Sequence, residues 1–376
     1  MLLFLIYSFT VSYDEPYETT IFTNGDEGSK FYRIPTIVTC KDGSLLLSND
    51  KRWFDKGDLP NKIDVVVKRS TDGGKTWGPT IYVAEPDSKL GYGDASLVVD
   101  QDTGVVLCIF NGEVGFFDST ANNPIRVFVS KSFDNGLTWT KKVDITSQLY
   151  GSECTVPERQ TWEAMFLTGG HTLQLRSGRI IAGGVVRVPG ATEVKAIPAY
   201  SDDFGDTWDV AIQPAAFPGD ESKYVELNDG SVLASIRHSP NREFSLSNTK
   251  ALTWNDPFEQ PDIKDPGCNA DMVRYTSTKD GYDKNRILHT MVYNPQTRIN
   301  TTVLLSYDEG KTWPVKKVIY PGKSDVSGIT VRNDGMIVLF YEKEWNNGFN
   351  QTISIFSLEW LTDGKDVYKP PTKKQH

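Results

Sequence analysis

The stretch Ser70–Trp77, STDGGKTW, decides the fold, because its spacing returns along the 376-residue chain. A Ser is followed by Asp two residues later, Gly four residues later, and then Thr-Trp. Three further good copies occupy residues 132–139, 201–208 and 306–313, and a degraded copy at 247–254 has lost the Asp and the Gly. The copies start 46 to 69 residues apart, which is typical of one four-stranded propeller blade with its loops.

The chemistry of the repeat predicts a hairpin turn. Asp and Gly supply the side-chain-to-backbone hydrogen bonds and the positive φ that a tight turn needs, and the Trp is expected to pack between neighbouring sheets. Apolar residues alternate before the first copy at Ile63, Val65 and Val67, as in a half-buried strand. We therefore predict an all-β chain, a six-bladed β-propeller of four-stranded antiparallel sheets over residues 14–368, followed by a polar tail at 369–376.

Composition excludes several classes of function. The formal net charge of −9 argues against nucleic-acid binding, which needs a basic surface. The four cysteines have no CxxC spacing and the four histidines no ligand spacing, so we expect no metal. No glycine-rich phosphate loop occurs, so we expect no cofactor either. Whether any two cysteines pair stays open.

The apolar run at residues 1–13 resembles the core of a signal peptide, although no Lys or Arg precedes it. The alternative is an N-terminal apolar strand. Two glycosylation triplets, at Asn300 and Asn350, are compatible with export. We expect a secreted or cell-surface protein, monomeric and without a membrane-spanning partner.

The segment Phe31–Pro35, FYRIP, stands before the first repeat. Together with the four repeats it resembles the sialidase (neuraminidase) family, with its F/Y-R-I-P and Asp-box (BNR) signatures. The resemblance implies that terminal sialic acids of sialylated glycans are the partners, each held by its carboxylate on three arginines. Guanidinium suits this task because it stays charged and forms paired bonds to a carboxylate. The matching positions are Arg33, Arg242 and Arg298, although Arg237 lies near the second.

The resemblance also implies the remaining site residues. Asp58 matches the general acid better than Asp55 does, and Arg52 matches an arginine that contacts the substituents of the sugar ring. The other matches are Asp94, which would bind a sugar hydroxyl, Glu226, which would activate the nucleophile sixteen residues before Arg242, and Glu342, which would orient Arg33.

One position departs from the family pattern. The family's tyrosine nucleophile falls on Val326, in Pro321–Ile329, and valine cannot attack carbon. Three interpretations follow: an exo-α-sialidase in which Glu226 activates a water and the product anomer inverts, a sialic-acid-binding propeller with little or no turnover, or a retaining sialidase in which Val326 is a laboratory substitution or sequence error. The retained acid and glutamates favour the enzyme.

Two other classes compete with the sialidase interpretation. A protein-binding propeller with Asp boxes would not need the three arginines or the Tyr-Arg-Ile-Pro segment. A glycosidase with two catalytic carboxylates is the weaker rival.

Overall fold

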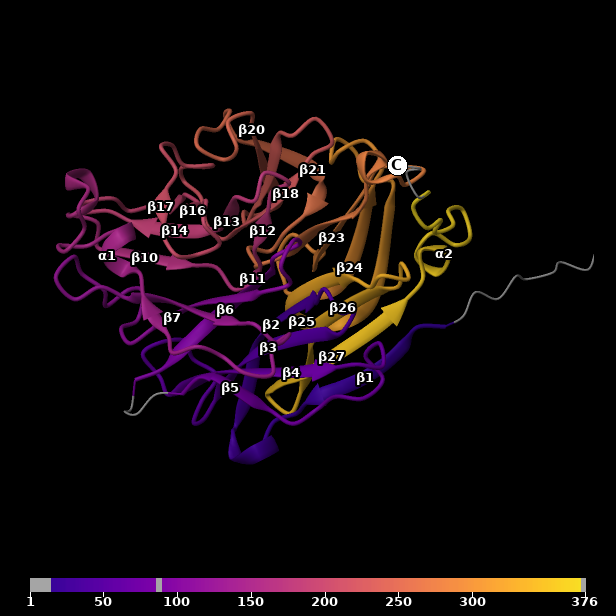
Figure 1. Cartoon of the computed structure of the whole chain (residues 1–376), viewed down its shortest axis with the longest axis horizontal. Coiled ribbons are helices and arrows are strands. Elements are labelled where there is room, and N and C mark those ends of the chain that lie inside the picture. Colours follow the sequence, from indigo (N-terminus) through magenta and orange to yellow (C-terminus); the bar gives the residue numbers. More distant parts are fainter. Residues whose placement is uncertain (1–14, 86–89, 373–376) are drawn as a thin grey trace, which may run out of the picture.

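The computed structural model describes residues 15–85 and 90–372, and within them the chain is all-β (Figure 1). The only α-helices in this part are single turns, α1 (Thr146–Leu149) and α2 (Leu358–Leu361). Three short 3-10 helices lie at Asp26–Gly28, Pro157–Arg159 and Thr278–Asp280. The expected all-β class is therefore confirmed. The predicted signal segment at residues 1–13 and the end of the predicted tail lie outside the described residues.

Strands of the first half form antiparallel sheets in chain order. The first sheet contains β2 (Phe31–Thr39), β3 (Leu45–Arg52), β4 (Ile63–Ser70) and β5 (Ile81–Ala84). The second contains β6 (Tyr92–Val99), β7 (Val106–Gly112), β8 (Arg126–Ser132) and β9 (Val143–Asp144), with β11 (Gly170–His171) added in parallel to β6.

The middle of the chain is less regular. A four-stranded sheet contains β12 (Leu173–Gln174), β13 (Ile180–Ala182), β16 (Ala199–Ser201) and β17 (Asp209–Val210). A three-stranded sheet contains β10 (Ala164–Leu167), β14 (Gly184–Arg187) and β15 (Lys195–Ala196). The next four-stranded sheet contains β18 (Ser222–Glu226), β19 (Val232–Ile236), β20 (Asn241–Ser247) and β21 (Phe258–Lys264).

The last sheet has seven strands and includes the first and the last strand of the described residues. In order across the sheet they are β1 (Tyr17–Phe22), β27 (Gly348–Phe356), β26 (Ile337–Trp345), β25 (Val315–Val331), β24 (Ile299–Ser306), β23 (Arg286–Val292) and β22 (Asp271–Thr276). The long strand β25 pairs with β24 through its first part and with β26 through its second. Figure 1 shows β1 beside β27, so the N-terminal strand completes the sheet that ends the fold.

All five repeats fold into the same turn. In the first copy the amide of Gly74 donates to Ser70 Oγ (2.9 Å) and that of Thr76 donates to Asp72 Oδ1 (2.9 Å). In the degraded copy Thr249 replaces the aspartate, accepting from the Thr253 amide at 2.8 Å. Ala251 there takes the positive φ (67°) that glycine takes elsewhere. The turn therefore forms even where Thr and Ala replace the Asp and Gly of the repeat.

Each turn packs against the preceding sheet of the chain. Gly136 lies so close to Leu46 of β3 that an added Cβ would come within 2.5 Å of a methyl carbon. The first turn packs in the same way against the last sheet, with Gly74 on Ile355 of β27. The tryptophans follow this pattern: Trp208, for example, joins the core cluster of Leu107 and Ile109 from β7. The hydrophobic core thus lies between successive sheets.

The four cysteines are all buried and free, which answers the pairing question. No helix among the described residues is both long and apolar enough to cross a membrane.

Candidate functional site

Arg33, near the start of β2, is held by a carboxylate from the last sheet. Its Nε and Nη2 donate to Glu342 Oε1 (2.7 Å) and Oε2 (3.1 Å). Glu342 has no exposed side-chain area and also accepts from the amides of Ile34 (3.0 Å) and Val326 (3.0 Å). Ile34 has φ 55°, a conformation that costs a β-branched residue about 1–3 kcal/mol. Glu342 thus fixes both the arginine and the strained residue after it, and the structure brings this predicted pair together.

Arg298, in the loop before β24, converges with Arg33 on one carboxylate. Its Nη1 donates to Asp325 Oδ1 at 2.5 Å, and Arg33 Nη2 lies 3.2 Å from Asp325 Oδ2. The second Arg298 nitrogen, Nη2, donates to the carbonyl of Gly267 (2.9 Å). Two guanidinium groups from distant parts of the chain are therefore arranged to bind a single carboxylate, which in this structure belongs to the protein itself.

Arg52, Asp58 and Asp94 gather beside Arg33 around a buried aspartate. Arg52 Nη2 donates to Asp50 Oδ2 (2.8 Å), and Asp50 Oδ1 accepts from the Asp94 amide (3.0 Å). Burial raises the pKa of Asp50 to about 6. Burial, followed by the negative charges of Asp50 and Asp58, raises the pKa of Asp94 well above its ordinary value. The predicted ring-binding residues Arg52 and Asp94 therefore lie close enough for their charges to affect each other's pKa.

The two candidate acids differ in their partners. Asp58 Oδ1 lies 2.8 Å from Arg52 Nη1, with 75% of its side chain exposed to solvent. Asp55 Oδ1 instead accepts from the Gly57 amide (2.7 Å) and from Asn61 Nδ2 (3.2 Å) within its own loop. Asp58 is thus a solvent-accessible carboxyl in contact with Arg52, whereas Asp55 contacts only its own loop among these bonds. The geometry is therefore more compatible with Asp58 than with Asp55 as the acid.

The expected position of Arg242 at the mouth of the site is corrected by its burial. Its side chain has 0% exposure, and its Nη1 donates to Asp265 Oδ2 (2.7 Å) and to the Cys268 carbonyl (2.8 Å). A ligand cannot reach a guanidinium so enclosed. Asp265 also accepts from the amides of Gly267 and Cys268, so Arg242 supports from behind the loop whose Gly267 carbonyl binds Arg298.

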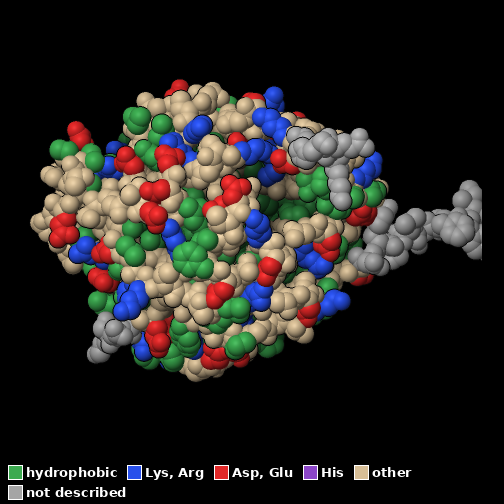
Figure 2. Space-filling model, in the orientation of Figure 1, with side chains coloured by type: hydrophobic (Ala, Val, Ile, Leu, Met, Phe, Trp, Pro, Cys, Tyr) green, Lys and Arg blue, Asp and Glu red, His purple; other side chains and the backbone are tan. Residues whose placement is uncertain are grey.

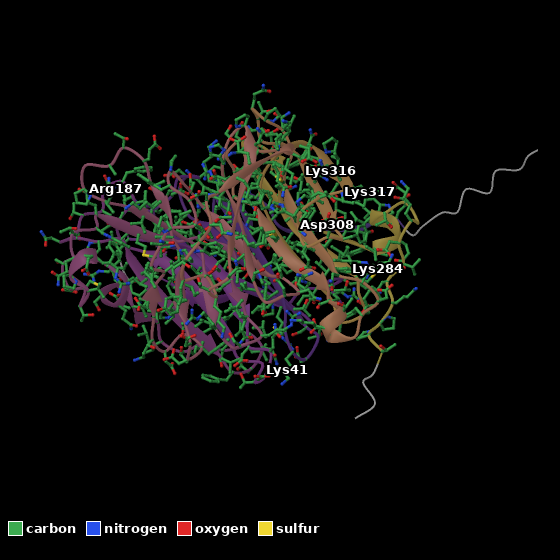
Figure 3. All side chains as sticks on the ribbon, turned by 90° about the horizontal axis from the view of Figure 1, so that it is seen from above. Lys41, Arg187, Lys284, Asp308, Lys316 and Lys317 are labelled. Carbon is green, nitrogen blue, oxygen red and sulfur yellow. The ribbon has the colours of Figure 1, made fainter. Side chains whose placement is uncertain are left out.

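Glu226 is also placed away from the predicted site. It ends β18, where its Oε2 accepts from the Arg176 amide (2.8 Å). It lines a cavity of about 620 Å³ together with the ends of β2 and β6, whereas Arg33 lies at the start of β2. Lys41, another residue of this cavity, lies at the lower edge of Figure 3. Glu226 therefore faces the end of the strands opposite to the arginines.

A second glutamate–arginine pair, Glu221 and Arg237, lies just before β18 and just after β19. Arg237 Nη1 donates to Glu221 Oε2 at 2.7 Å, and the guanidinium keeps 29% side-chain exposure. The positive charge of Arg237 acts on Arg298 and Cys268, and the negative charge of Glu221 acts on Asp94. Burial raises the pKa of Glu221. Glu221 and Arg237 are also sixteen residues apart, like Glu226 and Arg242. The spacing is therefore compatible with either pair and does not distinguish them.

Val326 is almost fully buried and packs in a small apolar cluster with Ile34, Cys268 and Val292. It lies beside Glu342, whose Oε2 accepts a hydrogen bond from the Val326 amide. No three His, Cys, Asp or Glu side chains gather as metal ligands within residues 15–85 and 90–372. Figure 2 shows acidic and basic side chains interspersed over the face in view.

The chain is thus an all-β protein with repeated Asp-box-type turns, in which two arginines converge on one carboxylate. The BNR repeat-like domain family matches residues 51–339. A sialidase of Micromonospora viridifaciens is 32% identical over 364 residues, covering 92% of this chain and 54% of the relative. The chain belongs to the sialidase family with BNR repeats.

Solved structures agree on the fold. The Hadza microbial sialidase Hz136 superposes with a TM-score of 0.81 at 24% identity, covering 91% of this chain and 69% of that one. The Trypanosoma rangeli sialidase in complex with the inhibitor DANA superposes with a TM-score of 0.71 at 18% identity, covering 89% and 56%. The chain spans about half the length of the first two curated relatives, the sialidases of M. viridifaciens and Bacteroides fragilis.

Proposed function

We propose that this chain is an exo-α-sialidase-type glycoside hydrolase that binds the carboxylate of a terminal sialic acid. The observation that carries the proposal is the convergence of Arg33 and Arg298 on one carboxylate, at 3.2 and 2.5 Å. Paired charge-assisted bonds from guanidinium are the strongest and most selective way for side chains to hold such a group. The family membership supports the choice of sialic acid as its source.

The third arginine of the site is Arg237 in this proposal, in place of Arg242. Its guanidinium is partly open to solvent and lies within electrostatic reach of Arg298. Arg52 and Asp94 would contact the substituents of the sugar ring, since they adjoin Arg33 and share the Asp50 carboxylate. The T. rangeli sialidase binds the inhibitor DANA, and we expect DANA to bind here.

Two carboxyl groups divide the proposed chemistry. Asp58, exposed on its loop, would protonate the leaving glycosidic oxygen. Glu221 would be the base in place of Glu226, and its raised pKa suits a group that accepts a proton from water near neutral pH. Because Val326 offers no nucleophile, the water would attack the anomeric carbon directly and invert its configuration.

The finer architecture in this proposal is a closed six-bladed β-propeller. The support is the packing of each repeat turn on the preceding sheet and of the first turn on the last sheet, with β25 passing from one blade to the next. The site residues Arg33 and Asp94, and Glu221 before β18, would then lie at the same end of the innermost strands. Action outside the cell, as a monomer on sialylated glycans, belongs to the same proposal.

A second candidate function is sialic acid binding with little turnover. The burial of Val326 in an apolar cluster at the nucleophile position favours it. A pure binding protein would have no evident use for Asp58 as an accessible acid, which is why the hydrolase comes first.

A fluorogenic sialoside tests the two candidates, with NMR of the anomer that is released first. Release of the inverted anomer supports the hydrolase with water as nucleophile, and retention contradicts that mechanism. No turnover, with sialic acid binding that Arg298→Ala abolishes, favours the binding protein. Val326→Tyr should raise turnover sharply if the rest of the pocket is competent.

A further inference from the structure

Asp325 already fills the place where a ligand carboxylate would bind. It lies on β25 directly before Val326, with 9% exposure. Its two oxygens face Arg33 Nη2 (3.2 Å) and Arg298 Nη1 (2.5 Å), and Cys268 Sγ donates to Oδ1 (3.1 Å). Burial and the charge of Asp325 keep the pKa of the Cys268 thiol well above its ordinary value, so it stays a donor.

The backbone on both sides of Asp325 is anchored. The Ser324 amide donates to the Arg298 carbonyl (3.0 Å), and Ser324 Oγ donates to the Glu342 carbonyl (2.6 Å). On the other side, the Val326 amide donates to Glu342 Oε2 (3.0 Å). The pairing of β25 with β26 is irregular between Ser324 and Ser327, which turns Asp325 out of the regular ladder. Rotation of the Asp325 side chain is therefore a way for its carboxylate to leave the arginines without breaking these backbone bonds.

Several other donors of the two arginines bind the protein itself. Arg33 uses Nε, and Nη2 in part, on Glu342, and Arg298 uses Nη2 on the Gly267 carbonyl. The nitrogens that face Asp325 are among those that a ligand carboxylate would use. Two carboxylates at this place would repel each other in surroundings that screen charge poorly.

We propose that Asp325 is a resident carboxylate that competes with the ligand's carboxylate for Arg33 and Arg298, and so sets how tightly the site binds an acidic sugar. The application to acidic sugars rests on the proposed function, while the competition itself rests only on the geometry of Asp325. Neutralising Asp325 should strengthen binding, in contrast to the usual loss when a buried charged residue of a site is changed.

The first experiment asks whether the place is a carboxylate site, without any sugar. Asp325→Ala removes the carboxylate and leaves room for formate between the two arginines. We expect formate to raise the thermal unfolding midpoint of Asp325→Ala in a saturable way, and not that of the wild type. Asp334→Ala is the matched control, since it removes an aspartate paired with Arg332 on the following hairpin. Equal formate effects on all three proteins would overturn the proposal.

The second experiment uses DANA and the isosteric variant Asp325→Asn, which keeps the shape of the side chain if the alanine variant does not fold. Calorimetry should show binding at least about tenfold tighter than that of the wild type, because a competing charge is gone. Asp334→Asn should bind like the wild type. Equal or weaker binding by Asp325→Asn overturns the proposal and leaves the proposed function intact. If neither protein binds DANA, the proposed function fails, and the formate experiment decides the competition by itself.

Discussion

Two glutamate–arginine pairs with the same spacing have different surroundings in this molecule. Glu221 and Arg237 bond to each other at 2.7 Å, with Glu221 buried and Arg237 partly exposed. Glu226 and Arg242 do not meet: the first lies at the far end of β18, and the second is enclosed with Asp265. A shift of five residues moves a glutamate about 16 Å along a strand, from one end of the sheet to the other. Spacing along the chain therefore predicts a glutamate sixteen residues before an arginine. Only the position of each residue on its strand shows which glutamate and arginine contact each other.

The largest expected difference between the pairs is in catalysis. Glu221→Gln should lower kcat by about a hundred- to ten-thousand-fold, because an amide cannot take a proton from water. Glu226→Gln, which keeps an oxygen to accept from the Arg176 amide, should change kcat/KM by less than about twofold. Hydrolysis of a fluorogenic sialoside measures both. A larger loss in the Glu226 variant would reverse the assignment.

The arginines should differ next, in stability. Arg242→Ala leaves Asp265 buried without its partner, which should cost about 3–5 kcal/mol of the free energy of unfolding. Arg237→Ala removes an ion pair whose guanidinium is partly exposed, and should cost less than the Arg242 change. Urea denaturation followed by tryptophan fluorescence measures the two variants. Similar losses would show that both arginines are structural.

Ligand affinity should depend on Arg237, although its effect on stability is the smaller one. Arg237→Ala should weaken DANA binding about ten- to a hundred-fold, the value of one or two hydrogen bonds between charged groups. Arg332→Ala, which removes an arginine from an exposed ion pair elsewhere, is the control and should leave the affinity unchanged. Calorimetry at fixed pH and salt gives the comparison. An unchanged affinity in the Arg237 variant would remove it from the site.

The smallest expected effect is a displacement of the pH profile. The base must be deprotonated to act, so the raised pKa of Glu221 moves the acidic limb of kcat/KM to higher pH. Burial is the main cause, Arg237 opposes it, and Asp220 adds to it. Asp220→Asn should therefore move the limb to lower pH, and Glu226→Gln should leave it in place. A limb that follows Glu226 instead would show that the base lies at the other end of β18.

The repeats allowed the all-β class of fold to be predicted. The pairing of Arg33 with Glu342 was implied by the family resemblance, and the structure contains that contact. The contact between Asp58 and Arg52 was not predicted. The second arginine could not be placed in this way, because the degraded repeat at 247–254 gave no firm anchor for counting back. Nothing in the sequence distinguished Arg237 from Arg242 by burial, which depends on residues as distant as Asp265.

The sequence by itself determined the hairpin turns, the alternating strands and the residue types available to hold a carboxylate, because these depend on neighbours within a few residues. The tertiary structure decided that Glu221 and Glu226 lie at opposite ends of β18, and that Asp325 lies between Arg33 and Arg298. Those outcomes depend on burial and on contacts between strands that are far apart in the chain. The strength of a charge interaction there depends on the distance between the groups and on their exposure to solvent.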